Sequence, residues 1–208
     1  MDAALLLQIE VARFKQWAAG IPVDTRSGEW ECDYPEWRRL WAAAKCLVET
    51  VPVAAWTEAT TEDFVYALAR DNEVEVIADD LAGRSDTLLI LAARAIHSVE
   101  TDAKWQIAAK LGDMNEHKLK AEALLVQFVQ DADEYVSRRS LLALATLKSG
   151  KAESFAERAW KTGHEYQRIA ALWALKDVGS SKLNDYLLRA EEDGREYVVR
   201  NATEIRAA

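Results

Sequence analysis

The chain has 208 residues, of which 50% are hydrophobic and 29% are charged, so it is long enough to bury the core of one ordinary domain. This composition excludes an intrinsically disordered chain. Only 3 residues are proline, and residues 53–208 contain none. The lack of proline favours long helices and argues against a turn-rich β-sandwich.

The formal net charge of −9 belongs to one half of the chain. Residues 1–104 contain 19 acidic and 10 basic residues, whereas residues 105–208 contain 16 of each. A nucleic-acid-binding protein needs cationic groups to displace counterions from phosphates, and neither half has a cationic surplus, so nucleic acid is a disfavoured partner. An acidic half can attract a basic protein, although plain solubility explains the same charge.

The cysteines and the N-terminal residues favour a cytoplasmic protein. Cys32 and Cys46 are too few for a disulfide framework and lack the CxxC spacing of a metal site. A reducing cytoplasm is therefore the expected compartment. The opening MDAALLLQIEVARF has no basic n-region and no long apolar run, so we predict no signal peptide. No apolar stretch is long enough to predict a membrane span.

The N-terminal part of the chain, 1–84, predicts helices at 2–19, 36–50, 60–70 and 73–82. Thr61 precedes EDFVYALAR and is the predicted N-cap of the third helix. The first two helices are separated by the long irregular segment GIPVDTRSGEWECDYPEW.

This irregular segment is the first candidate binding site. Aromatic residues alternate with acidic ones in GEWECDYPEW, an arrangement that suits a cationic partner surface, and the candidate residues are Trp30, Glu31, Asp33 and Tyr34. The alternative is a segment packed over the first helices, with Trp37 and Trp41 directed into the core. We favour this alternative for Trp41 and leave both readings open for Trp30 and Asp33.

An internal repeat is the strongest signal in the sequence. The segments KAEALLVQFVQDADEY, KAESFAERAWKTGHEY and KLNDYLLRAEEDGREY begin at Lys120, Lys151 and Lys182, which gives a period of 31. Residues 120–150 and 151–181 share nine identities in 31 positions without gaps, and residues 151–166 and 182–197 share six in sixteen. The identities include two tyrosine pairs of one column, which contains Tyr135, Tyr166 and Tyr197.

Each repeat predicts two helices joined at glycines. One helix has a stripe of Tyr135, Leu141, Leu144 and Leu147, which recurs as Tyr166, Leu172, Leu175 and Val178. The other has the apolar set Leu124, Leu125 and Phe128, which recurs as Phe155, Ala156 and Ala159 and then as Tyr186, Leu187 and Ala190. We expect positive φ at the joints, Gly150, Gly163, Gly179 and Gly194. One such hairpin cannot bury its stripe, but a stack of hairpins can, which predicts an α-solenoid.

These repeats resemble HEAT-like repeats, in particular those of the bilin-lyase type. The resemblance lies in the length of the repeat unit and in the motifs DEYVSRRSLLALATL, HEYQRIAALWALKDVG and REYVVRNATEI, over residues 116–206. The stretches from Thr87 and Trp105 look like diverged members, and Trp105 is expected in the core. The resemblance implies a single all-α domain over 1–208 of about five or six helical hairpins, with an irregular part at 1–84 and repeats at 85–208. A bilin-lyase activity follows from it at fold level only.

No catalytic or metal-binding constellation is recognised. His97 and His117 have no ligand partner at helical spacing, and His164 forms the one HE dipeptide, whereas the HEAT-repeat deoxyhypusine hydroxylases bind iron through several. Glu134, Glu165 and Glu196 fall in the first turn of a helix, where the helix dipole favours an acid. No nucleotide-binding or hydrolase motif occurs. We therefore expect no catalytic residue, cofactor or metal.

The exposed columns of the repeat are the second candidate site, because in a repeat array the core columns stay apolar while the exposed ones vary. The polar columns are Gln127, Arg158 and Arg189, and Gln130, Lys161 and Glu192. Trp160 and Trp173 lie in columns that end in an acid, so they are either partly exposed contact residues or core residues below an atypical last repeat. The predicted partner-binding residues here are Gln127, Arg158, Trp160, Lys161, Trp173 and Arg189.

The sequence favours a non-enzymatic scaffold or adaptor that binds another protein with a basic surface. An immunity protein that neutralises a basic toxin domain is a specific form of this hypothesis. The alternative is an enzyme similar to the HEAT-like DNA glycosylases that act on alkylated DNA. Such enzymes need a cationic, aromatic-lined cleft, for which the tryptophans are present and the charge is not.

Overall fold

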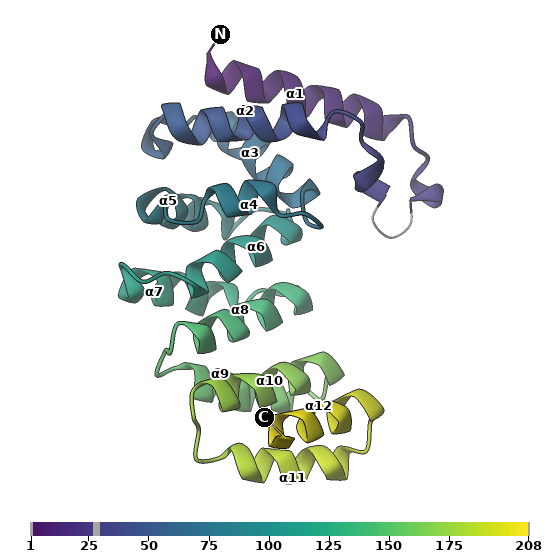
Figure 1. The fold of residues 1–208 in the computed structure, drawn as a ribbon, viewed down its shortest axis with the longest axis vertical. Coiled ribbons are helices and arrows are strands. Elements are labelled where there is room, and N and C mark those ends of the chain that lie inside the picture. Colours follow the sequence, from purple (N-terminus) through teal and green to yellow (C-terminus); the bar gives the residue numbers. More distant parts are fainter. Residues whose placement is uncertain (1, 27–29, 208) are drawn as a thin grey trace. The chain divides into compact units, whose positions relative to one another are not determined.

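The computed structural model describes residues 2–26 and 30–207, and this part of the chain contains helices and turns but no strand. The predicted all-α class is confirmed. The chain divides into two compact units, Met1–Ile107 (unit 1) and Ala108–Ala208 (unit 2), and each is described by itself (Figure 1). The single domain over 1–208 stays a prediction. None of the described helices is both long and apolar enough to cross a membrane.

Unit 1 contains helices close to the predicted ones. The helices at 2–19, 36–50 and 60–70 are confirmed to within two residues, whereas the fourth is shorter than predicted. The short 3-10 helices η1 (Val23–Thr25), η2 (Trp30–Asp33) and η3 (Val53–Ala55) lie between them. The α-helices are α1 (Ala3–Ala19), α2 (Trp37–Thr50), α3 (Glu58–Arg70), α4 (Val76–Asp80), α5 (Ser85–Ala95) and the first part of α6 (Thr101–Gly112).

The start of α3 corrects the predicted N-cap. The N-cap is Thr57, whose Oγ1 accepts a hydrogen bond from the backbone N of Thr60 at 3.1 Å. Thr61 lies inside the first turn, where it is buried and its Oγ1 donates to the Thr57 carbonyl oxygen at 3.0 Å. Threonines recur one turn apart in TEATTED, so the cap preference alone does not distinguish the first from the last.

Aromatic rings fill the core of unit 1 around Phe14, which is fully buried. The centroid of the Phe14 ring lies 5.4 Å from that of Trp17, 4.8 Å from that of Tyr34 and 5.4 Å from that of Trp37. These rings come from α1, the segment after η2 and α2. The cluster therefore attaches the irregular segment to the helices, and it explains much of the aromatic content of this half.

Unit 2 is a stack of helical pairs, with one helix of each pair in each of two layers. α10 packs against both α8 and α12, so these three form one layer. α9 packs against α8 and α10, and α11 against α10 and α12, so they belong to the other layer, together with α7 (Figure 1). The helices are α7 (Lys118–Phe128), α8 (Glu134–Thr146), α9 (Ala152–Lys161), α10 (Glu165–Asp177), α11 (Leu183–Asp193) and α12 (Glu196–Ala207).

Most of the predicted apolar stripes form the core of unit 2. The tyrosines at their start do not: Tyr135 is 39% exposed and Tyr166 is 48% exposed. Both lie in the first turn of a helix, before the turns that pack against the opposite layer, and this position corrects their assignment to the stripe. The predicted core residues that are buried include Leu125, Phe128, Leu141, Leu144, Leu147, Phe155, Ala156, Ala159, Leu172, Leu175, Tyr186, Leu187 and Ala190.

Several residues that are identical between repeats form contacts from one repeat to the next. The Lys151 Nζ lies 2.7 Å from the Glu122 Oε1, and one repeat later the Lys182 Nζ lies 2.9 Å from the Glu153 Oε1. Ser180 Oγ also donates to Glu153 Oε2 at 2.6 Å. Lysine, glutamate and serine at these positions therefore form one recurring polar link.

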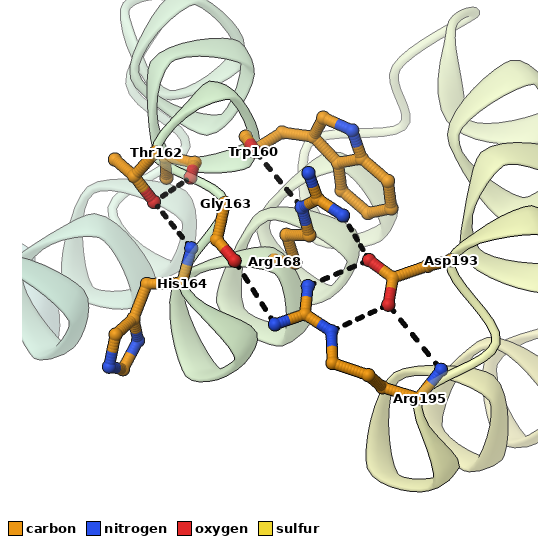
Figure 2. Close-up of polar contacts among 8 residues, drawn as sticks. Trp160, Thr162, Gly163, His164, Arg168, Asp193 and Arg195 are labelled. Carbon is orange, nitrogen blue, oxygen red and sulfur yellow. Dashed lines mark hydrogen bonds and ion pairs between the residues drawn. The ribbon is translucent and has the colours of Figure 1, made fainter.

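Asp193 joins the last two repeats (Figure 2). Its buried carboxylate accepts from Arg195 Nε at 2.6 Å and Arg195 Nη2 at 2.8 Å, and it pairs with Arg168 of α10. Arg195 also donates to the Gly163 carbonyl oxygen at 3.0 Å, and Arg168 to the Trp160 carbonyl oxygen at 3.2 Å. These guanidinium groups hold the pKa of Asp193 far below its usual value.

Left-handed backbone occurs at three of the four predicted glycine joints. Gly163, Gly179 and Gly194 have φ of 76°, 66° and 72°. The prediction is wrong for Gly150, because the residue equivalent to Gly179 is Lys148, which has φ of 61°. The turn after α8 is therefore made with a lysine in a conformation that glycine adopts more easily.

Candidate protein-binding surfaces

The irregular segment of unit 1 is folded onto the helices, as the alternative interpretation predicted. Trp30 is half-buried, and its ring stacks on that of Trp17 with centroids 5.7 Å apart. The Arg26 guanidinium covers Trp30 at 4.4 Å from the ring centroid. Tyr34 is 4% exposed. The expectation that Tyr34 contacts a partner is corrected, because the segment turns back at η2 and places this ring against Phe14.

The two acids of the segment differ in exposure. Glu31 is 9% exposed, and its Oε1 lies 3.9 Å from Arg70 Nη1. Burial raises the pKa of Glu31 above its usual value. Asp33 is exposed. Of the two predicted acids, Asp33 alone is exposed, and Glu29 of the same segment lies outside the described residues.

Trp37 and Trp41 lie next to each other at the start of α2, as their spacing predicted. Their rings stack with centroids 5.7 Å apart, and both residues are half-buried. The Trp37 Nε1 donates to the Glu31 carbonyl oxygen at 2.8 Å, and the Trp41 Nε1 donates to Asp71 Oδ1 at 3.0 Å. Both rings therefore help to hold the fold.

The polar columns of unit 2 are exposed as predicted. Gln127, Arg158, Lys161 and Arg189 are exposed on α7, α9 and α11. The guanidinium of Arg158 lies 3.8 Å from the ring centroid of Phe155, and that of Arg189 lies 4.7 Å from the ring centroid of Tyr186. Their exposure is established, and their role in binding stays a prediction.

The two tryptophans of the repeat have different environments. Trp160 is 7% exposed, and its ring meets that of Tyr186 edge-on at 5.3 Å between centroids. Trp160 is therefore a core residue, which corrects its assignment as an exposed contact. Trp173 is half-buried: its Nε1 donates to Asn201 Oδ1 at 2.8 Å, and Lys176 Nζ lies 4.7 Å from its ring centroid.

A second exposed surface, on α8, α10 and α12, was missed by the sequence reasoning. We call Tyr135, Tyr166 and Tyr197 the tyrosine face; they are 39%, 48% and 44% exposed. The Arg138 guanidinium lies between the first two rings, 4.6 Å from the centroid of Tyr135 and 5.1 Å from that of Tyr166. Arg200 lies 4.9 Å from the centroid of Tyr197. An arginine three residues after the tyrosine, in the first and third repeats, was the available signal.

Basic residues of unit 1 are largely paired within the unit. Arg13 and Arg39 pair with Glu10, and Lys15 with Asp63. In the same way, Lys45 pairs with Asp80, Arg84 with Glu49, and Arg70 with Glu100. In the described part of unit 1, several exposed acids have no ion partner, among them Asp24, Asp33, Glu58 and Glu62.

Titratable groups of the described residues do not form a metal-binding cluster. No group of three His, Cys, Asp or Glu side chains is arranged to hold a metal there. Burial raises the pKa of Asp71 to about 6. Its carboxylate accepts hydrogen bonds from Trp41 Nε1 at 3.0 Å and from the Ile77 backbone N at 2.8 Å. Asp71 thus joins α2 to the start of α4, which is a structural role.

Comparison with known families agrees with the repeat. A model of HEAT repeats matches residues 121–206, which include α8 to α12. Comparison with curated proteins and with solved structures finds no significant match. The tyrosine face and the exposed columns both lie within the matched range.

Proposed function

We propose that this chain, whose residues 121–206 are HEAT repeats, is a non-enzymatic scaffold that binds another protein through a basic surface of that partner. Stacked helical repeats provide extended surfaces that suit protein partners. The two cysteine thiols fit the reducing conditions of the cytoplasm, where we place this function.

The observation that carries the proposal is the charge of unit 1. Its basic side chains are largely paired internally, while Asp24, Asp33, Glu58 and Glu62 are exposed without an ion partner among the described residues. Unpaired surface carboxylates give unit 1 a negative field that attracts and orients a cationic protein. Unit 2 has no comparable excess, because its acidic and basic residues balance.

The tyrosine face supports protein binding from the other unit. Tyrosine and arginine are among the residue types that contribute most to binding at protein interfaces. Here the arginines are already held against the rings by cation–π contacts, so less side-chain freedom is lost on binding.

A specific form of the proposal is an immunity protein. A toxin domain that acts on nucleic acid needs a cationic cleft, and an acidic protein surface is complementary to such a cleft. Binding there would block the cleft and neutralise the toxin.

The test is affinity capture on the immobilised chain at low salt, followed by elution with increasing salt and identification of the eluted proteins. We expect a basic partner whose affinity falls steeply with ionic strength. Lysine substitution of Asp24, Asp33, Glu58 and Glu62 together is expected to weaken that partner by about tenfold or more. The matched control reverses four exposed acids of unit 2, Asp113, Glu116, Glu192 and Glu204, and should change the affinity by less than about threefold.

Two results would contradict the proposal. One is an affinity that is unchanged in the unit 1 variant; the other is tight, saturable binding of a duplex that contains abasic or alkylated sites, which would favour the DNA glycosylase alternative. For the immunity form, co-expression of the chain should restore growth to cells that express the captured partner.

A further inference from the structure

We infer that a groove in unit 1 is the place where the basic partner inserts an arginine or lysine side chain together with a neighbouring apolar residue. This inference rests on the proposed function and adds the chemistry of one contact. The groove measures about 770 Å³, which lies within the range of protein binding pockets. It is lined by Lys15, Trp56, Glu58, Thr61, Glu62, Val65, Tyr66, Arg94, His97, Ser98, Val99 and Glu100.

The two aromatic residues Trp56 and Tyr66 of the groove lining are held by contacts within unit 1. Trp56 is 6% exposed; its Nε1 donates to the Val51 carbonyl oxygen at 3.0 Å and its ring packs 5.0 Å from that of Phe64. The Tyr66 ring is flanked by Lys15 Nζ at 4.6 Å and by the Arg70 guanidinium at 5.3 Å. A groove with fixed walls binds a side chain without a prior reorganisation of its own.

Cationic groups at the groove already have partners in unit 1. Lys15 Nζ donates to Asp63 Oδ1 at 3.4 Å, in addition to its contact with Tyr66. Arg94 Nη1 donates to Thr61 Oγ1 at 2.9 Å and to the Trp56 carbonyl oxygen at 3.4 Å. Neither group forms an ion pair with an acid of the groove lining.

The carboxylates of Glu58 and Glu62 are the available charges. These residues lie one turn apart on the same side of α3, and both are exposed with no ion partner among the described residues. Glu100, the third acid of the lining, is paired with Arg70 at 2.5 Å. Because Arg94 bonds to the neutral Thr61 hydroxyl and Trp56 carbonyl oxygen, its charge offsets one of the two unpaired carboxylates, and the rim keeps a net excess of one negative charge, which favours a cation.

Arginine and lysine fit both parts of the groove. Their methylene stems cover apolar surface while the charged head reaches a polar rim, here from Val65 and Tyr66 to Glu58 and Glu62. Arginine suits the site better, because its planar guanidinium can bind a carboxylate with two hydrogen bonds. Val99, which is 89% exposed, provides contact for an adjoining apolar side chain.

The first experiment uses a defined probe, the capped peptide Leu-Arg-Leu-Arg, in a titration of the full chain followed by backbone amide NMR. We expect saturable shifts at residues 58–66 and 94–100. A twin peptide with neutral citrulline in place of arginine keeps the shape and loses the charge, so it should bind at least about threefold more weakly at low salt. Equal binding of both peptides, or shifts elsewhere only, would overturn the inference.

The second experiment distinguishes binding in the groove from electrostatic attraction of the partner by the whole surface of unit 1. The groove pair is the double variant Glu58→Gln and Glu62→Gln. The control pair is the double variant Asp24→Asn and Asp33→Asn, which removes the same charge elsewhere in unit 1. We expect the groove pair to weaken both the probe and the captured partner by about threefold or more, and the control pair to leave the probe unchanged. Equal weakening of the partner by both pairs would refute the groove and keep the proposed function. No weakening by either pair, or by the fourfold reversal, would refute the proposed function itself.

Discussion

Unit 1 and unit 2 differ in the pattern of their polar side-chain contacts. In unit 2 the same side chains recur at the same contacts, as the pairs Lys151–Glu122 and Lys182–Glu153 show. In unit 1 the interior is held by single contacts between residues distant in sequence. The buried side-chain atoms that lack a hydrogen-bond partner among the described residues all belong to unit 1: Glu10 Oε2, Tyr34 Oη, Arg70 Nε and Gln106 Oε1.

The regular structure and the excess of exposed charge therefore lie in different units. Unit 2, which contains the repeats, has balanced charge and satisfied polar contacts, which are features of a stable support. The irregular unit has the charge excess, the groove and the unsatisfied polar atoms. Features that serve binding often lower stability, so we expect the acidic surface to lie in the less stable unit.

The largest effect is expected from Phe14→Ala, which empties the centre of the aromatic cluster. Loss of a fully buried phenylalanine costs about 3–5 kcal/mol of unfolding free energy. We expect hydrogen exchange to accelerate throughout unit 1 while the amides of α8 to α12 stay protected. The matched variant Leu144→Ala, at a fully buried position of unit 2, should reverse the pattern. Uniform loss of protection in both variants would show that the two units unfold as one.

The next effect is that of Asp193→Asn, which leaves Arg168 and Arg195 without their carboxylate. Removal of one partner of a buried ion pair costs about 3–5 kcal/mol, and we expect the lower end of this range because the side chains of Arg168 and Arg195 are 26% and 36% exposed. The pKa of Asp193 is lower in the folded chain than the 3.8 of the unfolded chain. The ion pairs of Asp193 therefore contribute their full share of the unfolding free energy above pH 3.8, and this share is lost as the pH falls below 3.8. Urea unfolding followed by circular dichroism should therefore give a large difference from the wild type at pH 7 and a smaller one near pH 3.

Asp71→Asn is expected to show the opposite pH dependence. The pKa of Asp71 is about 6 in the folded state and about 3.8 when unfolded, so the folded chain retains a proton that the unfolded chain releases. The free energy of unfolding consequently falls as the pH rises from about 4 to 6. Because asparagine cannot ionise, the stability of the variant relative to the wild type should rise by about 1–2 kcal/mol between pH 4 and pH 8, on top of a pH-independent cost, since the asparagine amide can accept only one of the two hydrogen bonds. A wild type that gains stability between pH 4 and 6 relative to Asp71→Asn would contradict this assignment.

The smallest effect tests the repeat itself. Lys148 and Gly179 occupy equivalent positions with φ of 61° and 66°. Lys148→Gly should stabilise unit 2 by about 0.5–1 kcal/mol, because glycine adopts this conformation without a steric penalty. Gly179→Lys should cost a similar amount. Thermal unfolding of both variants measures the two effects, and a destabilised Lys148→Gly would show that the hydrogen bond from Lys148 Nζ to the Asp177 carbonyl oxygen matters more than the backbone.

The sequence predicted the fold well where a pattern repeats. The helix positions and the core residues Leu141 and Leu144 follow from periodicity, because helical spacing decides which side chains reach the opposite layer. The exposure of Tyr135 and the burial of Trp160 did not follow, because periodicity does not say where along a helix the packed turns begin and end. Periodicity therefore predicted burial more accurately for residues at the centre of the core than for residues at its edges.

The candidate site of unit 1 was harder to predict. Charge counting located the acidic half, but Glu31 and Tyr34 turned out to lie inside, since one turn at η2 reverses the segment. Glu58 and Glu62 were not predicted as binding residues, because acidic residues on a helix are usually explained by exposure to solvent. The groove beside them depends on Arg94 of α5 and on Val99 after it, two helices further along the chain than α3.

The contacts between successive repeats also bear on how the chain folds during synthesis. Lys151 and Lys182 each bind a glutamate of the preceding repeat, and Arg195 binds the carbonyl oxygen of Gly163, which also belongs to the preceding repeat. A ribosome makes the chain from the N-terminus, so each new repeat finds its anchoring group already synthesised. Unit 2 can thus be assembled one hairpin after another during translation, with every hairpin docking on the one made before it.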